Sequence, residues 1–179
     1  MAPQALRRSL WSTAALVAAA ALLALALYGE RPSPHVGTFE AAGVMRHIPL
    51  EEIVAVEVAS GLKRWWFTRD AAGWHVAAAE GPPAAKGAAS IENALRLLRN
   101  SAPERILYGE ELAGSAAFGL DPPALVVGVK GRTSFSVAFG AANPLGLARY
   151  ARVEGHSEIV LLPRYVADAW EVVVGLRSN

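Results

Sequence analysis

Histidine and cysteine are the residues best suited to metal binding and nucleophilic catalysis, and this sequence has few of them. It contains 179 residues, no cysteine and four histidines, which are His35, His47, His75 and His156. No histidine has a second histidine two or four residues away, or an acidic residue in a ligand pattern. The lack of cysteine excludes disulfides, thiolate metal sites, a cysteine nucleophile and a lipidated N-terminal cysteine together. The sequence therefore predicts no metal and no cofactor.

Patterns for hydrolysis or phosphate binding are also missing. No G-x-S-x-G motif offers a serine nucleophile. Residues 128–134 lack the G-x-x-x-x-G-K-[ST] spacing of a phosphate loop and fit a hairpin turn better. Glu51 and Glu52 are neighbours in sequence, so their side chains diverge and make a poor pair for general acid–base work. The same holds for Glu110 and Glu111. We therefore expect that the protein is not an enzyme.

Aromatic and arginine side chains on predicted strands are the best candidates for a binding surface. Trp65 and Trp66 are adjacent, so one ring belongs to the core and the other points to the opposite sheet face. That second ring would expose a large apolar surface to water unless a helix, a partner protein or the membrane surface covers it. Arg149 and Arg152 also point to opposite sides of one strand. We expect an interaction surface formed by residues among Trp65, Trp66, Tyr150 and Arg149.

A proline-rich turn precedes one of the strands. It consists of Phe118, Gly119, Leu120, Asp121, Pro122 and Pro123. Phe118 and Leu120 can bury their side chains beneath the turn, Gly119 permits a conformation that a Cβ would oppose, and Asp121 can accept backbone N–H bonds. Pro122 pushes the residue before it into an extended conformation. Turn chemistry explains every residue, so we interpret this segment as structural rather than as a ligand-binding loop.

The N-terminal part predicts a membrane anchor. Residues 10–28 carry no charge, and as a helix they span about 28 Å, close to the bilayer core. Arg7 and Arg8 precede the run, which leaves the short N-terminus in the cytoplasm and exports the remainder. The alternative is a cleaved signal peptide, for which Ala24-Leu25-Ala26 is a suitable site. The length of the run favours a retained anchor, but whether it is cleaved stays open.

Charge argues against nucleic-acid binding. With 17 basic and 16 acidic residues, the net charge of +1 gives no global attraction for a polyanion. Arg96, Arg99 and Arg105 make a modest basic patch that is more typical of a solvated face than of a surface for an acidic partner or lipid headgroups.

The elements that must position these residues follow from hydrophobic periodicity. Alternating segments predict strands at 53–58, 63–69, 74–76, 124–129, 133–139, 148–153 and 158–162. Ser90 is a plausible N-cap for an amphipathic helix through residue 98, and Pro163 can open a final helix. The prediction is an α+β protein with an N-terminal transmembrane helix, antiparallel sheet(s) and two amphipathic helices, for which a duplicated βββα unit is one arrangement. Its parts are a cytoplasmic N-terminus (1–9), the anchor (10–28), a linker (29–47) and a periplasmic domain (48–179).

One family resemblance covers residues 53–170. The turn at 118–123, the strand that ends at Gly140, the loop at 143–146 and the strand at 148–152 resemble a bacterial envelope family known only as domain of unknown function forty-three-forty. Trp74-His75-Val76 and the helix at 91–98 are also similar to it. The resemblance implies one N-terminal anchoring helix and, for some members, a role as an auxiliary component of ABC-type transporters. It carries over no catalytic residue, and this chain is shorter than many members.

These observations favour one functional hypothesis and leave two others open. The first is a non-enzymatic, single-pass, membrane-anchored periplasmic accessory protein of the bacterial inner membrane, which contacts the lipid bilayer through residues 10–28. It would bind an envelope protein, with exposed sheet edges as one route. The second is a small-molecule or glycan binding module that feeds a transporter, and the third is an unrecognised hydrolase. Neither nucleic acid nor metal is expected as a partner.

Overall fold

The computed structural model describes residues 43–81, 87–112 and 115–177. The predicted cytoplasmic N-terminus (1–9), the predicted anchor (10–28) and most of the predicted linker lie outside the described residues. Met45, which falls within the predicted linker, is fully buried in the main core of the domain.

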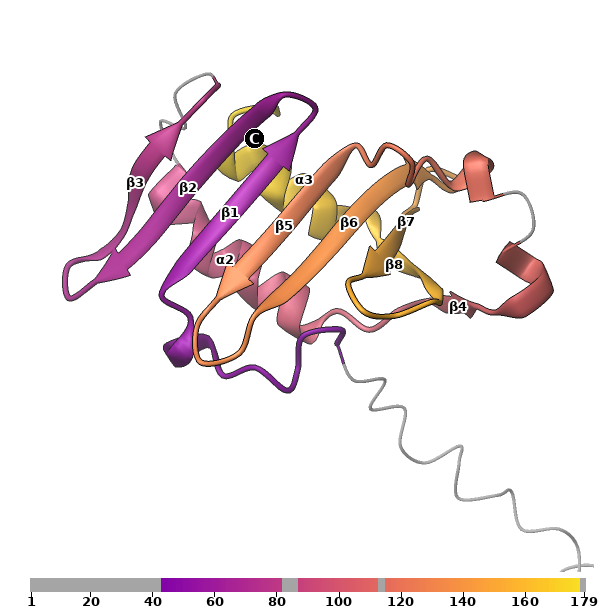
Figure 1. Cartoon of the computed structure of the whole chain (residues 1–179), viewed down its shortest axis with the longest axis horizontal. Coiled ribbons are helices and arrows are strands. Elements are labelled where there is room, and N and C mark those ends of the chain that lie inside the picture. Colours follow the sequence, from indigo (N-terminus) through magenta and orange to yellow (C-terminus); the bar gives the residue numbers. More distant parts are fainter. Residues whose placement is uncertain (1–42, 82–86, 113–114, 178–179) are drawn as a thin grey trace, which may run out of the picture. The chain divides into compact units, whose positions relative to one another are not determined.

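The domain is built on one sheet of eight antiparallel strands in the order β3-β2-β1-β5-β6-β7-β8-β4 (Figure 1). The strands are β1 (Ala55–Ser60), β2 (Lys63–Asp70), β3 (Gly73–Ala79), β4 (Arg105–Leu107), β5 (Leu125–Lys130), β6 (Phe135–Ala142), β7 (Ala148–Val153) and β8 (Ile159–Pro163). Most of the longer strands alternate buried and partly exposed side chains. Such alternation is expected where one face of a sheet is buried and the other meets water.

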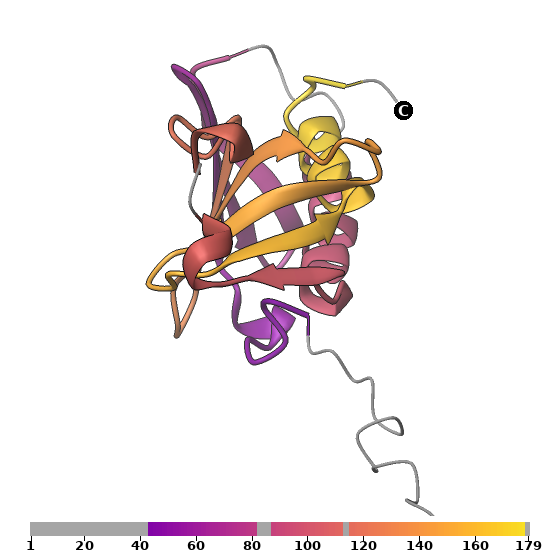
Figure 2. The same cartoon turned by 90° about the vertical axis from the view of Figure 1, so that its right-hand side faces the viewer.

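Two helices, α2 (Gly87–Asn100) and α3 (Arg164–Val173), cover the same face of the sheet and contact each other (Figure 2). The apolar stripe of α2 is fully buried and consists of Ile91, Ala94, Leu95 and Leu98. The stripe of α3 is Val166, Ala167, Trp170 and Val173. Helix α2 begins three residues before Ser90, so that serine lies inside the helix and is not its N-cap. Pro163 is the N-cap of α3.

A second, smaller core lies at one end of the sheet, on the face away from the helices. The 3-10 helices η3 (Gly109–Leu112) and η4 (Ser115–Phe118) and the turn after them supply its cover. We call residues 109–112 and 115–123 the cover segment. Its core holds Leu107, Leu120 and Ile159, with partly buried side chains of β6, β7 and β8 packed against them.

The predicted fold class is wrong. The described residues form one continuous sheet with three strands on one side of the β1–β5 pairing and five on the other, and β4 lies at the far edge beside β8. The sheet therefore does not divide into equal copies of a βββα unit. Within the described residues, no helix is long and apolar enough to cross a bilayer. Local hydrophobic periodicity predicted the individual strands but carries no information on which distant strands pair.

Candidate functional site

The candidate site is the part of the sheet that neither the helices nor the cover segment hides. Its central row follows from the strand register: Trp66 pairs with Glu57, Glu57 with Gly128, and Gly128 with Ser136. The N–H of Glu154 donates to the Ser136 carbonyl and extends the row. Paired residues project from the same face of a sheet. We call this surface, over β2, β1, β5 and β6, the open face.

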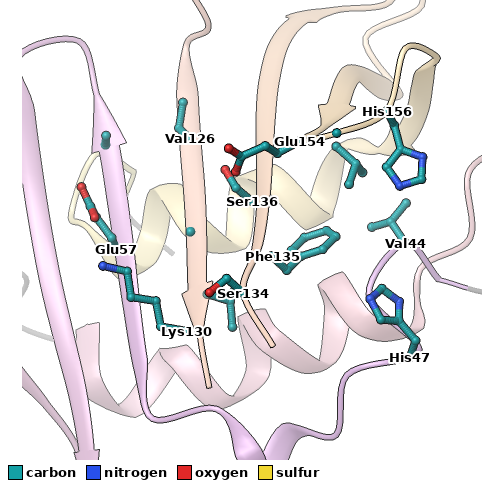
Figure 3. A pocket seen from close by; sticks show the side chains of 15 residues that line it. Val44, His47, Glu57, Val126, Lys130, Ser134, Phe135, Ser136, Glu154 and His156 are labelled. Atoms are coloured by element: carbon teal, nitrogen blue, oxygen red, sulfur yellow. The ribbon is translucent and has the colours of Figure 1, made fainter. Parts of the chain in front are cut away.

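A hollow of about 670 Å³ occupies the middle of the open face (Figure 3). Gly128 lies at its centre and has no side chain to fill it; the nearest heavy atom to a Cβ built there would be 3.9 Å away. Ala59 and Val126 complete an apolar floor. The hollow is a shallow depression with small residues beneath it.

Polar side chains stand around that floor. Glu57 and Lys130 lie on the β1–β5 side, whereas Ser136 and Glu154 lie on the side of β6 and β7 (Figure 3). The Glu57 carboxylate accepts a 3.1 Å hydrogen bond from Arg64. The rim thus carries both signs of charge, and such a balanced surface does not select strongly for an anion or a cation.

The two tryptophans take the opposite positions that strand alternation predicts. Trp65 is fully buried in the main core, and Trp66 lies half-buried on the open face next to Glu57. Gly81 packs so closely against the Trp65 indole that a Cβ there would overlap the ring. Only the second tryptophan is available to a partner.

The other two predicted surface residues do not join Trp66. Arg149 points to the helix side, where its Nη1 donates a 2.7 Å hydrogen bond to Glu171 Oε1. Tyr150 points to the opposite side but lies under the cover segment, with its ring centroid 4.6 Å from that of Phe118. The four residues predicted to form one surface therefore lie in different places. Trp66 is on the open face, Tyr150 is under the cover segment, and Trp65 and Arg149 are on the helix side of the sheet.

The proline-rich turn anchors the cover segment. Leu120 is buried in the small core and Phe118 packs beside it. Gly119 has φ +61°, and Gly140 approaches the turn so closely that a Cβ would overlap the Phe118 carbonyl oxygen. The Asp121–Pro122 peptide bond is cis. Among the described residues the Asp121 carboxylate receives no backbone hydrogen bond, in contrast to the expectation for that side chain.

The histidines of the domain lie apart from any set of metal ligands. His75 Nε2 is 2.9 Å from Thr68 Oγ1, on the open-face side of β3. His156 Nδ1 lies 3.0 Å from Glu158 Oε1 at the end of the hollow. No group of three or more histidine, aspartate or glutamate side chains within residues 43–81, 87–112 and 115–177 could hold a metal ion.

Glu158 is the one group of this region whose pKa shifts clearly. Its pKa lies below the ordinary glutamate value, first because a backbone N–H hydrogen-bonds to the carboxylate and second because His156 contacts it. The carboxylate therefore stays charged to lower pH than an ordinary glutamate, which retains negative charge beside the hollow.

The predicted basic patch is largely neutralised by neighbouring acids. Arg96 lies 3.8 Å from Glu92 on α2, and Arg105 forms an ion pair with Glu111. Arg99 is partly buried, with an Nε atom that no hydrogen bond satisfies in the described part of the chain. Arg96 and Arg105 therefore add little net positive charge to this surface, and its role as a solvated face stays a prediction.

Sequence reasoning did not identify the hollow or most of its lining. Gly128 within an otherwise apolar strand was the available signal, because a strand glycine often marks a place where another molecule approaches the backbone. Glu57 lies on β1, Ser136 on β6 and Glu154 in the turn directly after β7, and only the long-range register brings them together.

Comparison with known proteins gives no relative. No family model, no curated protein and no solved structure matches this chain. The resemblance to the envelope family therefore stays a prediction.

Proposed function

We propose that the protein is a non-enzymatic accessory protein of the bacterial envelope, and that its open face binds another envelope protein. In this proposal the apolar segment 10–28 keeps the chain at the inner membrane and the domain lies in the periplasm. Membership of a transport complex is the role that the resemblance adds.

The half-buried indole of Trp66 is the observation that carries the proposal. Most side chains beside it on the open face are short or charged, so the ring is the largest apolar group on that surface. Tryptophans on otherwise polar surfaces are frequent energetic centres of protein interfaces. The mixed charges of Glu57, Arg64 and Lys130 suit the polar rim of such an interface.

A small molecule or glycan in the hollow is the second candidate, favoured by the gap over Gly128. Its volume of about 670 Å³ falls within the range of ligand sites. Native mass spectrometry of the protein from its own membranes tests this candidate. A defined added mass, lost in Gly128→Val, would support the ligand; an unmodified mass in both proteins would argue against it.

Photo-crosslinking in cells tests the main proposal. A photoreactive amino acid at Ser136 places the probe on the open face, and the same group at the exposed Asn93 of α2 places it on the helix side as a matched control. We expect one discrete adduct from position 136, with a protein that mass spectrometry identifies, and none of comparable yield from position 93.

The Trp66 ring provides the second arm of that experiment. Trp66→Ser should reduce the adduct by about tenfold, as for loss of one aromatic hot spot, and Trp66→Phe should retain most of it. Thermal melts of both variants separate a lost contact from a lost fold. Absence of any adduct from position 136 would overturn the proposal.

A further inference from the structure

Two exposed leucines share one short loop between β6 and β7. Leu145 is 78% exposed and Leu147 is 67% exposed. We call residues 143–147 the leucine loop. Leu62 is more exposed still, but it stands alone in the β1–β2 turn. Apolar side chains presented together on a protruding loop cost solvation unless something covers them.

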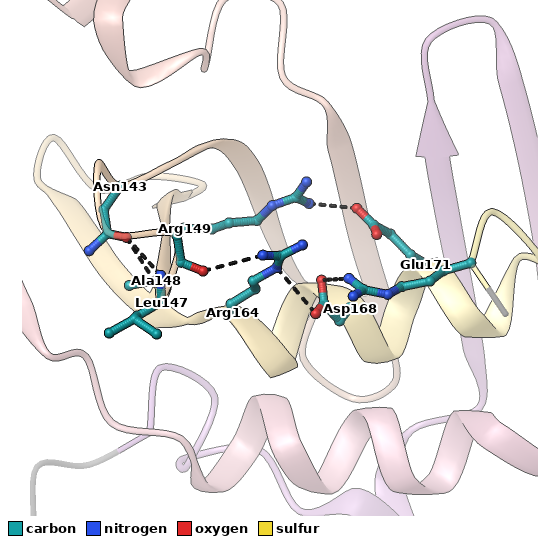
Figure 4. A network of polar contacts seen from close by, with 9 residues as sticks. Asn143, Leu147, Ala148, Arg149, Arg164, Asp168 and Glu171 are labelled. Carbon is teal, nitrogen blue, oxygen red and sulfur yellow. Dashed lines mark hydrogen bonds and ion pairs between the residues drawn. The ribbon is translucent and has the colours of Figure 1, made fainter. Parts of the chain in front are cut away.

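The leucine loop is held in one conformation by hydrogen bonds at both ends (Figure 4). Asn143 Oδ1 accepts from the N–H groups of Leu147 at 3.0 Å and Ala148 at 3.2 Å. The Gly146 N–H donates to the Asn143 carbonyl at 2.8 Å, and the Arg164 N–H donates to the Leu147 carbonyl at 2.8 Å. The leucines are therefore displayed by a loop that is ordered before anything binds.

Most polar backbone groups of the loop are already satisfied. The Asn143 N–H donates to the Ala148 carbonyl, and Arg164 Nη1 donates to the Gly146 carbonyl at 3.4 Å. Pro144 has no N–H, so Leu145 is the one loop residue whose N–H lacks a partner within the described residues, and the carbonyls of Pro144 and Leu145 also lack one there. A loop can enter an apolar medium only when few of its backbone groups would lose hydrogen bonds to water.

The surroundings of the loop suit a bilayer surface. Arg164, whose side chain is 46% exposed, begins α3 directly beside it, whereas the hydroxyl of the next residue, Tyr165, accepts a 3.2 Å hydrogen bond from Ser101 and so points toward the end of α2. Arginine can lay its aliphatic stem on apolar groups and keep its guanidinium at the headgroup level. Asp168 lies 3.4 Å from Arg164 Nε and 2.6 Å from Arg177 Nη1, so this one carboxylate offsets only one of the two positive charges and leaves a small net positive charge. Attraction would come mainly from the leucines and depend little on salt.

We propose that the leucine loop inserts Leu145 and Leu147 into the interfacial region of a phospholipid bilayer. The largely paired backbone, the half-exposed Arg164 and the small net positive charge favour a lipid surface over a protein pocket as the occupant. This inference adds a second membrane contact to the proposed function, and it needs neither the open face nor a protein partner.

Spin-label depth measurements on the full chain test the insertion. The chain has no cysteine, so each single-cysteine variant carries one label without background. Leu145→Cys is the test site, and Thr133→Cys, which lies just before the other end of β6, is the control. The full chain is reconstituted in phosphatidylethanolamine–phosphatidylglycerol vesicles, and oxygen and a water-soluble nickel chelate serve as relaxation agents.

We expect the label at position 145 to lie roughly 5–10 Å below the headgroup level, as for other interfacial segments. The label at 133 should remain in water, and raised salt should leave both depths unchanged. Equal exposure of both labels to the nickel chelate would overturn the inference. A label at 145 that is shielded only in native membranes, and not in vesicles, would overturn it in favour of a protein partner.

A label at Ala20→Cys separates this inference from the anchoring part of the proposed function. Insertion at position 20 with a water-exposed label at 145 refutes the leucine loop alone. Insertion at 145 with a water-exposed label at 20 supports the loop and refutes the anchor.

Discussion

The Arg149–Glu171 ion pair shows how much a single contact depends on its exposure. Its two side chains are only 19% and 20% exposed, and the N–O distance is 2.7 Å. Arg132 and Glu52 lie 3.5 Å apart, but there the arginine side chain is 82% exposed. A partly desolvated pair contributes more than an exposed one, because water competes less for its hydrogen bonds.

Glu171→Gln should therefore lower the free energy of unfolding by about 1–3 kcal/mol, since Arg149 keeps its charge and loses its partner. Arg132→Gln is the matched control and should change it by no more than about 0.5 kcal/mol. Urea denaturation measures both. Equal effects of the two substitutions would show that burial of the Arg149–Glu171 pair has no energetic consequence.

Glu158 gives a prediction on pH. Because its pKa is lowered in the folded state, the contribution of this carboxylate to stability is present above the pKa of the unfolded chain. That contribution is lost as the pH falls through the folded pKa. The carboxyl carbon of Glu158, followed by NMR, should titrate below an ordinary glutamate.

His156→Ala should raise the Glu158 midpoint only in part, because the backbone hydrogen bond is the larger cause and remains. A midpoint that returns fully to the ordinary glutamate range in this variant would assign the whole shift to the histidine instead.

At the scale of elements, we expect the free energy of unfolding to respond in opposite ways when a methyl group is added at two strand glycines, Gly140 and Gly128. Gly140→Ala places a Cβ where the Phe118 carbonyl lies, so the cover segment must move away from β6. We expect a loss of about 1–3 kcal/mol in the free energy of unfolding, as for other overpacked sites. Limited proteolysis should also cut the cover segment faster in this variant.

Gly128→Ala is the matched control for that experiment. Its Cβ meets only ordinary contact distances, and alanine reduces the freedom of the unfolded chain. The free energy of unfolding should stay the same or rise by up to about 1 kcal/mol. A destabilisation similar to that of Gly140→Ala would contradict the open space above Gly128.

Individual elements were predictable where one face of the chain is apolar. The β-branched segment at 53–58 and the alternating segment at 133–139 correspond to β1 and β6. The stripe Ile91, Ala94, Leu95 and Leu98 is buried as its spacing requires. The cover segment was not predicted as such, because short 3-10 helices have weak sequence signals and their docking onto β6 depends on contacts distant in sequence.

At the scale of the molecule, the site could be predicted only in part. The opposite orientations of Trp65 and Trp66 follow from alternation alone. The loss of Tyr150 from the surface depends on the cover segment, and the partner of Arg149 lies 22 residues further along the chain. The β1–β5 pairing that creates the hollow is a long-range contact, which periodicity cannot specify.

Strand order therefore decides which residues form the open face. Without the β1–β5 pairing, Glu57 and Gly128 would not be neighbours, and the floor of the hollow would not exist. A binding role for this surface is thus a property of the complete sheet, and it is best tested in the intact protein.

Thiol labelling in intact cells tests that role most directly. Lys130→Cys reports on the open face and Asn93→Cys on the exposed side of α2, in a chain with no other cysteine. The reagent is a maleimide that passes the outer membrane but not the inner one. We predict rapid labelling at 93 and slow labelling at 130 in cells, with equal rates in the purified protein. Equal rates in cells, or no labelling at either site until the inner membrane is opened, would contradict the account.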